Sequence, residues 1–449
     1  MTLIKGISGL RGIVDSGLNE EIISDYASAF SKIQPKGKIL IARDARPHGE
    51  KFLKTIENVF SYYNIKFDNY NIIPTPTAQF LISHFKYVGG IVITASHNPI
   101  EWNGMKFIDE DGCFISKDKV EKLNKKHKKT TDTDFKNYTN NSKNLSHDGI
   151  INHLNHTCNL SIINRNLIIR KKFNVAIDAA NGAASDALPL LLEQLGCTVH
   201  KINCIANGLP NRGMEPINEN LNEISNYVKD NNIDIGFATD PDGDRLAIID
   251  DTGEPIGEEL TLPICILNLI SDLSNSPIVT NLSTSMMVDH VCNNFQIPVI
   301  RTAVGEINVV QEMKRTNSVI GGEGNGGVIL NESHLGRDSI VGTAIILNHL
   351  ATTNKKISEI CTSLPQLYMM KEKISINKIS FDEIKIKLKT NFKDVNVNEI
   401  DGIKFTWNRK WAHIRPSNTE PIIRIFIESY SESESNNLLN IIKGIISTK

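Results

Sequence analysis

Short runs of aliphatic residues alternate with longer stretches of helical periodicity along most of this 449-residue chain. The aliphatic runs include "KILIAR" (38–43), "GGIVIT" (89–94) and "IDIGFATD" (233–240), and a helical pattern such as "SDALPLLLEQLG" follows several of them. Repeated strand–turn–helix units are typical of α/β layers, so the pattern predicts mostly parallel, buried strands. In the C-terminal residues, strand patterns surround the helical stretch "FDEIKIKLKT", and a final helical pattern follows. This arrangement predicts a separate α+β domain.

Three segments are predicted to join domains. Residues 119–150 are polar and rich in Lys and Asn, which is typical of a solvated helix end followed by a linker. Residues 250–260 contain a turn and then a helix start, and at 363–373 a helical region gives way to an alternating pattern. Because the chain is also too long for one hydrophobic core, we expect several domains.

The composition argues against several classes of protein. The formal net charge is −2, whereas a general nucleic-acid or membrane-surface binder needs a basic field. No apolar run approaches the ~20 residues of a membrane helix, and the N-terminus lacks the features of a signal peptide. The seven cysteines are scattered without a C-x-x-C pair, as expected for reduced thiols. We therefore expect a cytoplasmic protein with neither nucleic-acid nor membrane partners.

The first candidate site is "ASHNP", where the chain leaves the run "GGIVIT". Asn98-Pro99 ends regular structure, so Ser96 is expected at the C-terminal edge of a sheet, where open α/β sheets bind ligands. A serine hydroxyl is a weak nucleophile without a base or a metal, and the adjacent His97 need not face the same side. The hydrolase elbow G-x-S-x-G is absent, since Thr94 and Asn98 occupy its glycine positions. A purely structural Ser-His turn is the alternative.

Three alternating aspartates form the second candidate site, in "DPDGDR". Asp240, Asp242 and Asp244 follow an apolar run and can converge on one hard cation. An EF-hand loop is rejected because Arg245 replaces its glycine and a strand-like segment follows. Carboxylates packed this closely repel one another unless a cation lies among them. Such oxygen ligands suit Mg²⁺ that also contacts a phosphate, and Arg245 adds a positive charge. A solvated acidic turn is the alternative.

The third candidate is the glycine-rich segment "GGEGNGGVIL". It formally matches the dinucleotide fingerprint G-x-G-x-x-G, but that fingerprint must open a helix, and "VIL" predicts a strand here. A nicotinamide site is therefore rejected. The loop displays Glu323 and Asn325, whose carboxylate and amide can bind vicinal hydroxyls or an amine. A glycine-rich hairpin without a ligand is the alternative.

The fourth candidate is "RPSNTEP", which gathers a guanidinium, two hydroxyls and an amide in one turn: Arg415, Ser417, Asn418 and Thr419. Such a turn can bind a phosphate dianion through side chains and backbone N–H groups. Polar turns are common, so this motif alone leaves its function open.

In this order, the four loops together with "GISGLRG" (6–12) resemble the signature motifs of the α-D-phosphohexomutase superfamily, over essentially the whole chain. The resemblance implies three related α/β domains and a smaller α+β C-terminal domain around a central cleft. With the joints above, we expect domains 1–150 with the phosphoserine loop, 151–253 with the metal loop, 254–367 with the sugar loop and 368–449 with the phosphate loop.

The resemblance also implies a reaction. Ser96 would carry a phosphoryl group and, with the three aspartates, bind one Mg²⁺ per subunit. The phosphoryl group would pass to a sugar hydroxyl, and the resulting sugar 1,6-bisphosphate would turn around and return its other phosphate to Ser96. The catalytic residues implied are Ser96, His97, Lys106, Arg11 and Arg245. Lys106 is expected as a general acid or base, which requires a lowered pKa.

Substrate contacts are implied at two loops. Glu323 and Asn325 would bind the sugar hydroxyls, and "TAVGEINVV" (302–310) resembles the loop that selects the sugar's orientation. The non-transferred phosphate would be held by Arg415, Ser417, Asn418 and Thr419.

The sugar loop departs from the pattern of many relatives. Those relatives end it in Ser-Gly-His, whereas this chain has Asn325-Gly326-Gly327. Their histidine, which helps proton transfer or sugar contact, is missing, so Lys106 or another group must suffice. "GEGNGG" itself resembles the branch of phosphoglucosamine mutases.

Several functions compete. The leading interpretation is interconversion of glucosamine 6-phosphate and glucosamine 1-phosphate. The same chemistry on mannose or glucose phosphates is the alternative, because Glu323 binds an ammonium or a hydroxyl almost equally well. A Mg²⁺-dependent sugar phosphatase belongs to another class, and it has no need of the second phosphate site. A catalytically silent binder would have lost Ser96 or an aspartate, and all are present. Either a monomer or a homodimer is compatible with the sequence.

Overall fold

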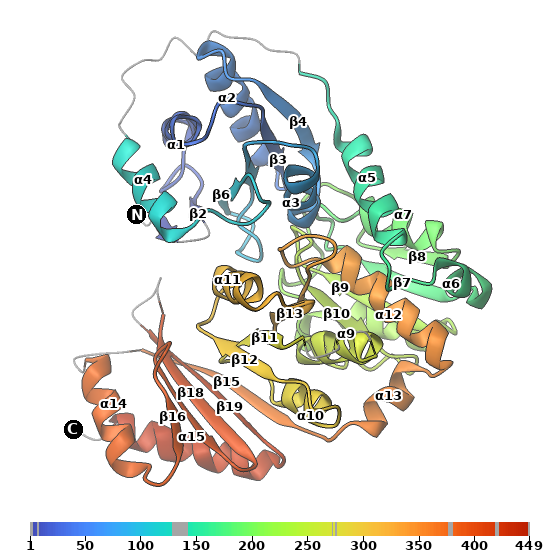
Figure 1. Ribbon diagram of the computed structural model, residues 1–449, viewed down its shortest axis with the longest axis vertical. Coiled ribbons are helices and arrows are strands. Elements are labelled where there is room, and N and C mark those ends of the chain that lie inside the picture. Colours follow the sequence, from blue (N-terminus) through green and yellow to red (C-terminus); the bar gives the residue numbers. More distant parts are fainter. Residues whose placement is uncertain are drawn as a thin grey trace.

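The strands of this computed structural model form four sheets among the residues it describes (Figure 1). The described residues are 3–6, 9–127, 142–271, 273, 276–375, 380–417 and 422–447.

The first three sheets share one topology. In each, three parallel strands are extended by an antiparallel strand that pairs with the third and follows it after a short loop. The strands are β3 (Ile39–Arg43), β4 (Phe67–Ile72), β5 (Gly89–Ile93) and β6 (Trp102–Asp109); β7 (Asn174–Asp178), β8 (Thr198–Ile202), β9 (Ile235–Thr239) and β10 (Leu246–Ile249); β11 (Ile278–Asn281), β12 (Val299–Thr302), β13 (Ile320–Glu323) and β14 (Gly327–Leu330).

The prediction of mostly parallel strands is wrong for the first sheet. There β1 (Ile4–Gly6) pairs with β2 (Gly9–Ile13), and β2 pairs with β6, both antiparallel. Only two of the five pairings in this sheet are parallel. The physical reason is that two short connections, β1–β2 and β5–β6, occur in this sheet: parallel strands need a long crossover, whereas a tight loop returns the chain antiparallel.

Alternation along β3 shows how the first sheet is covered on both faces. Ile39 and Ile41 pack with α1 (Glu20–Ile33) and α2 (Gly49–Tyr62) in one core cluster, while Leu40 packs with α3 (Thr75–His84) in another. Successive side chains of a strand point to opposite faces, so a strand buried on both faces is apolar throughout. This explains the uninterrupted aliphatic runs in the sequence.

The second of these cores extends over all three α/β units. It joins residues of α3, α5 (Ser146–Cys158), α7 (Ala187–Gln194), α9 (Thr261–Leu269) and α12 (Ser339–Thr353). Thirteen of the fifteen residues of α12 are buried, as expected for a helix that is apolar on all sides. This helix packs in the core that the three units share (Figure 1). The other helices are α4 (Lys117–Lys126), α6 (Arg165–Lys171), α8 (Asn222–Asp230), α10 (Met287–Asn293), α11 (Glu306–Thr316) and α13 (Ile357–Ser363).

The C-terminal residues form an α+β unit with an entirely antiparallel sheet, in the order β15-β19-β18-β17-β16. Its strands are β15 (Tyr368–Ser375), β16 (Asn396–Asn398), β17 (Ile403–Trp407), β18 (Lys410–Pro416) and β19 (Ile422–Ser429). Helices α14 (Phe381–Asn391) and α15 (Glu432–Ser447) pack on this sheet in a core of its own.

The C-terminal unit docks on the third unit through buried polar contacts. Glu428 of β19 accepts hydrogen bonds from Ser285 Oγ at 2.5 Å and from the backbone N–H of Met286 at 2.7 Å, at the start of α10. Lys404 of β17 donates to the carbonyl of Leu282 at 2.7 Å. These contacts fix the C-terminal sheet beside the loops that end β11 and β12.

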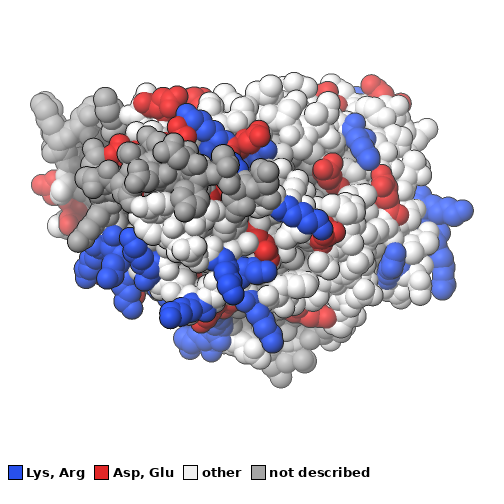
Figure 2. Space-filling view, turned by 90° about the horizontal axis from the view of Figure 1, so that it is seen from above, with Lys and Arg blue, Asp and Glu red and all other residues white. Residues whose placement is uncertain are grey.

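The surface carries charges of both signs. Figure 2 shows basic and acidic side chains interspersed over the face it presents, in keeping with the net charge of −2. Of the helices in the described part of the chain, none combines the length and the apolar character needed to cross a membrane.

Candidate active site

Three of the four predicted loops occupy equivalent places in the three related sheets. Ser96 lies between β5 and β6, the aspartates lie between β9 and β10, and Asn325 lies between β13 and β14. Hydrogen bonds join the second loop to the first, and Arg337 links the second loop to the third, as described below. The shared topology therefore brings together functional side chains that are far apart in the sequence.

Ser96 is buried and held in a strained backbone conformation, with φ of +52°. Its backbone N–H donates to Thr94 Oγ1 at 2.9 Å, and the Thr94 hydroxyl donates to Asp44 Oδ2 at 2.6 Å. Its carbonyl accepts from Arg46 at 2.7 Å. The Arg46 guanidinium also binds the carbonyls of Asn98, Pro99 and Trp102. The loop is thus fixed by two residues, Asp44 and Arg46, that were not predicted from the sequence.

The three aspartates converge as predicted. Carboxylate oxygens of Asp240, Asp242 and Asp244 lie within 4.8 Å of one another, and all three residues are buried. Ser96 Oγ donates to Asp240 Oδ2 at 3.3 Å. Asp242 Oδ1 and Asp244 Oδ1 are buried without a hydrogen-bond partner. Since buried carboxylate oxygens are normally satisfied, these atoms are suited to ligate a cation.

Lys106 of β6 pairs with two of these carboxylates. Its Nζ lies 2.6 Å from Asp242 Oδ2 and 3.2 Å from Asp244 Oδ2. Burial lowers the pKa of Lys106, but the charges of Asp242 and Asp244 outweigh it, so the pKa is raised overall. The expected lowering is therefore not found, and in this arrangement Lys106 is an ammonium ion. Arg11 of β2 donates to Asn98 Oδ1 at 2.9 Å, beside the serine loop.

His97 is oriented by Arg245. The Arg245 guanidinium lies 3.0 Å from His97 Nδ1 and can only donate, so Nδ1 accepts and the proton of the neutral ring is on Nε2. Nε2 lies 3.4 Å from Glu215, which also accepts from Arg245 at 2.9 Å. Burial and the charges of Arg245 and Arg11 lower the pKa of His97 well below its usual value. His97 is therefore a neutral side chain that lines the site.

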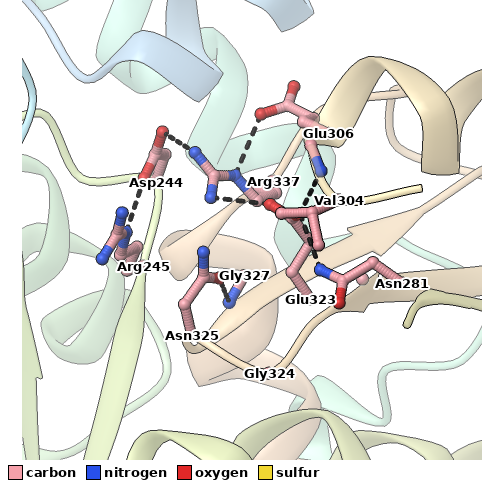
Figure 3. Close-up of polar contacts among 12 residues, drawn as sticks. Asp244, Arg245, Asn281, Val304, Glu306, Glu323, Gly324, Asn325, Gly327 and Arg337 are labelled. Atoms are coloured by element: carbon pink, nitrogen blue, oxygen red, sulfur yellow. Dashed lines mark hydrogen bonds and ion pairs between the residues drawn. The ribbon is translucent and has the colours of Figure 1, made fainter. Parts of the chain in front are cut away.

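The glycine-rich loop joins β13 to β14, the strand predicted from "VIL", in a β-hairpin, and the carboxylate of Glu323 in it is bound at both oxygens. Glu323 Oε1 accepts from Asn281 Nδ2 at 2.8 Å and from the backbone N–H of Gly305 at 3.0 Å. Asn325 Oδ1 accepts from the N–H of Gly327 at 3.2 Å. Figure 3 shows both side chains beside one arginine, Arg337.

Arg337 joins three of the loops. Its guanidinium binds Asp244 Oδ2 at 2.6 Å, Glu306 Oε2 at 2.9 Å and Glu323 Oε2 at 3.0 Å (Figure 3). Burial lowers the pKa of Arg337, but the three carboxylates have the larger effect and raise it above its usual value. The side chain is therefore permanently charged. Burial raises the pKa of Asp244, but the positive charges of Arg337, Lys106 and Arg245 outweigh burial. The pKa of Asp244 is therefore well below its usual value.

The predicted phosphate loop lies on the C-terminal unit. Arg415 of β18 forms an ion pair with Asp401 at 3.1 Å, and Asp401 accepts from the backbone N–H of Val304 at 3.0 Å. Val304 belongs to the segment 302–310 that was predicted to orient the sugar. Ser417 follows β18, whereas Asn418 and Thr419 lie outside the described residues.

Five residues of the site were missed in the sequence: Asp44, Arg46, Glu215, Glu306 and Arg337. None belongs to the four predicted loops. Two weak signals were available. "ARDARP" places charged residues directly after an apolar run, and "RDS" places charged residues directly before a helical pattern. Glu306 was inside the predicted orientation loop but had no assigned role.

Known proteins match this chain over its whole length. Four family models match it: phosphoglucomutase/phosphomannomutase alpha/beta/alpha domain I at residues 2–134, domain II at 151–253, domain III at 259–368 and the C-terminal domain at 380–443. A phosphoglucomutase/phosphomannomutase of Thermococcus kodakarensis is 32% identical over 97% of this chain and 96% of its own length.

Other relatives carry amino-sugar names. A phosphoglucosamine/phosphogalactosamine mutase of Sulfurisphaera tokodaii is 31% identical over 99% of both chains, and a phosphoglucosamine mutase of Methanocaldococcus jannaschii is 30% identical over 97% of both. Among solved structures, a putative phosphomannomutase of Thermus thermophilus has the same fold, with a TM-score of 0.84, 20% identity and 99% coverage of both chains.

The fold and the site define an α/β enzyme that handles sugar phosphates. The chain belongs to the phosphoglucomutase/phosphomannomutase family, within the α-D-phosphohexomutase superfamily. It is accordingly a phosphohexomutase, an isomerase that moves a phosphoryl group between positions of a hexose.

Proposed function

We propose that this enzyme is a phosphoglucosamine mutase, which interconverts glucosamine 6-phosphate and glucosamine 1-phosphate. The observation that carries the choice of sugar is a charge imbalance at the sugar loop. The buried carboxylates of Glu306 and Glu323 share one guanidinium, that of Arg337, which also binds Asp244 of the metal loop. Buried carboxylates in excess attract a cation, and glucosamine phosphate brings an ammonium group. The names of two of the relatives above, from Sulfurisphaera tokodaii and Methanocaldococcus jannaschii, support the same choice, whereas that of the Thermococcus kodakarensis relative names the neutral sugars.

A divalent cation fits the aspartate loop, and we propose Mg²⁺. The unpartnered Oδ1 atoms of Asp242 and Asp244, with Asp240 and a phosphorylated Ser96, offer the oxygen donors that Mg²⁺ prefers. When bound, the ion would neutralise charge on the transferring phosphoryl group. Lys106 would then add a second positive charge to the same carboxylates.

In the proposed reaction the phosphoryl group leaves Ser96 Oγ for a hydroxyl of the sugar. The P–Oγ bond breaks as a P–O bond to the sugar forms, and the proton of the sugar hydroxyl ends on Ser96 Oγ. After turning around, the sugar 1,6-bisphosphate returns its other phosphoryl group to Ser96 Oγ, and the serine proton ends on the sugar oxygen that is released. Arg46 and Thr94 hold the Ser96 backbone throughout. Glu323 and Asn325 would bind the sugar, and Arg415 and Ser417, with Asn418 and Thr419, would bind the phosphate that is not transferred.

The proposal is tested by initial mutase rates on glucosamine 1-phosphate, mannose 1-phosphate and glucose 1-phosphate, with Mg²⁺ and a trace of the matching bisphosphate. We expect a clear preference for the amino sugar. Equal or faster rates on the neutral sugars would keep the mechanism but overturn the substrate. Release of free phosphate without isomerisation would indicate a phosphatase.

A further inference from the structure

Arg337 lies outside every loop that the sequence singled out, yet its side chain binds the metal loop, the sugar loop and the start of α11 together. We propose that Arg337 is a positioning residue for substrate binding, which acts through Glu323 and ties the orientation of that carboxylate to the metal loop. The proposal rests on the proposed binding of the sugar by Glu323.

The hydrogen bonds of Glu323 carry the first step. Asn281 and the Gly305 backbone hold Oε1, and only Arg337 is within hydrogen-bonding distance of Oε2 among the described side chains that bind this carboxylate. A carboxylate held at both oxygens has one orientation. Without the guanidinium, Oε2 would lose its partner and the plane of the carboxylate would be free to turn.

The same guanidinium divides the donor atoms of Asp244. Arg337 and Lys106 both donate to Oδ2 of Asp244, at 2.6 and 3.2 Å, while Oδ1 accepts no hydrogen bond. The arginine thus holds one oxygen of Asp244 and leaves the other for a cation. Because Arg has a planar fork of donors, it can bind Asp244 and Glu323 at the same time, which an ammonium group does less well.

The space at Gly327 shows that the loop is built around this side chain. A Cβ atom at position 327 would lie 2.2 Å from Arg337 Cδ and 2.9 Å from its Cγ. Real Cβ atoms do not approach other atoms so closely, so the arginine occupies the volume that any side chain at 327 would need. The glycine that ends "GEGNGG" therefore leaves the space that the Arg337 side chain occupies.

The experiment compares Arg337→Lys with the unaltered enzyme, on whichever of the three sugar 1-phosphates the latter converts fastest. A wrong assignment of the sugar therefore does not affect the test. We expect KM for the sugar phosphate to rise at least 10-fold while the melting temperature falls by only a few degrees. Arg315→Lys is the control, because Arg315 also binds a carboxylate with two nitrogens, but its partner is Glu312 of the same helix and its side chain is exposed. Its KM should be unchanged.

A double-variant cycle separates positioning from general stability. Glu323→Gln and Arg337→Lys are combined in one variant. We expect its KM to match that of the more impaired single variant, because both changes disrupt the same ion pair between Arg337 and Glu323. A KM for Arg337→Lys within twofold of the unaltered enzyme, or single effects that multiply in the double variant, would overturn the proposal. If Arg337→Lys does not fold, Gly327→Ala displaces the same guanidinium, and the same KM pattern is required of it.

Discussion

Replacing Gly327 with alanine perturbs the site mainly through Arg337, although the new Cβ would also lie 3.1 Å from Asn325 Oδ1. The φ angle of Gly327 is outside the left-handed region, so alanine brings no backbone strain. Its Cβ would lie 2.2 Å from Arg337 Cδ, whereas ordinary van der Waals contact begins at about 3.4 Å, so the arginine must move by about 1 Å. Ion pairs of 2.6, 2.9 and 3.0 Å cannot survive such a shift in their present geometry.

The expected result is a fall in kcat/KM of about 10- to 100-fold, because displacements of about 1 Å in a positioned site cost rates of this order. This corresponds to about 1.4–2.7 kcal/mol of transition-state stabilisation. The assay is the initial mutase rate over a range of substrate concentrations, alongside thermal unfolding.

Gly444→Ala is the matched control for this variant. No atom lies within 4 Å of a Cβ built at Gly444, which lies in α15, so activity should not change. A kcat/KM for Gly327→Ala within twofold of the unaltered enzyme would refute the reasoning, since the guanidinium would then have moved without consequence.

Three further predictions address the chemistry and the pH dependence. Ser96→Ala should fold normally, by circular dichroism, and lose turnover; substantial mutase activity would exclude the serine as phosphoryl carrier. Asp242→Asn should lower the rate and the apparent Mg²⁺ affinity together, and an unchanged Mg²⁺ titration would contradict the metal site. Burial raises the pKa of Glu259 to about 7, so the folded state binds this proton more tightly than the unfolded one, whose Glu pKa is about 4.3. Stability from this group should decline as pH rises from about 4 through 7, by up to about 3 kcal/mol; urea unfolding of Glu259→Gln should lack that decline, and an identical pH slope would count against it.

The positions of the site loops could be predicted from the sequence because each follows a buried strand. Asp240 comes directly after the run "IGFAT", and a chain that leaves a sheet at polar residues places them at the strand's carboxyl edge. The antiparallel return after each loop was harder to foresee. The strand that follows Ser96, "WNGMKFID", mixes polar and apolar residues, and only its short spacing from the preceding strand indicated a hairpin.

Arg337 and Arg46 could not be predicted because their roles depend on which loops the fold brings together. Arg46 binds carbonyls around 50 residues further along the chain, and Arg337 binds a carboxylate 93 residues before it. Hydrophobic periodicity and local spacing contain no information about such distances. The lowered pKa expected for Lys106 was wrong for the same reason, since its partners lie more than 130 residues away.

The proposed phosphate loop would bring a further cation to the site from a separate unit. The nearby cations are already engaged by the carboxylates of the site: Lys106, Arg245 and Arg337 lie among Asp240, Asp242, Asp244, Glu306 and Glu323. A phosphorylated Ser96 would add about −2, which one divalent cation offsets. A second phosphate, on the substrate, finds no cation of this set uncommitted to a carboxylate. Arg415 of the C-terminal unit is paired with Asp401, and it would bind the phosphate beside or in place of that carboxylate. Since Asp401 also accepts from the Val304 N–H of the third unit, binding of a bisphosphorylated sugar would involve both units together.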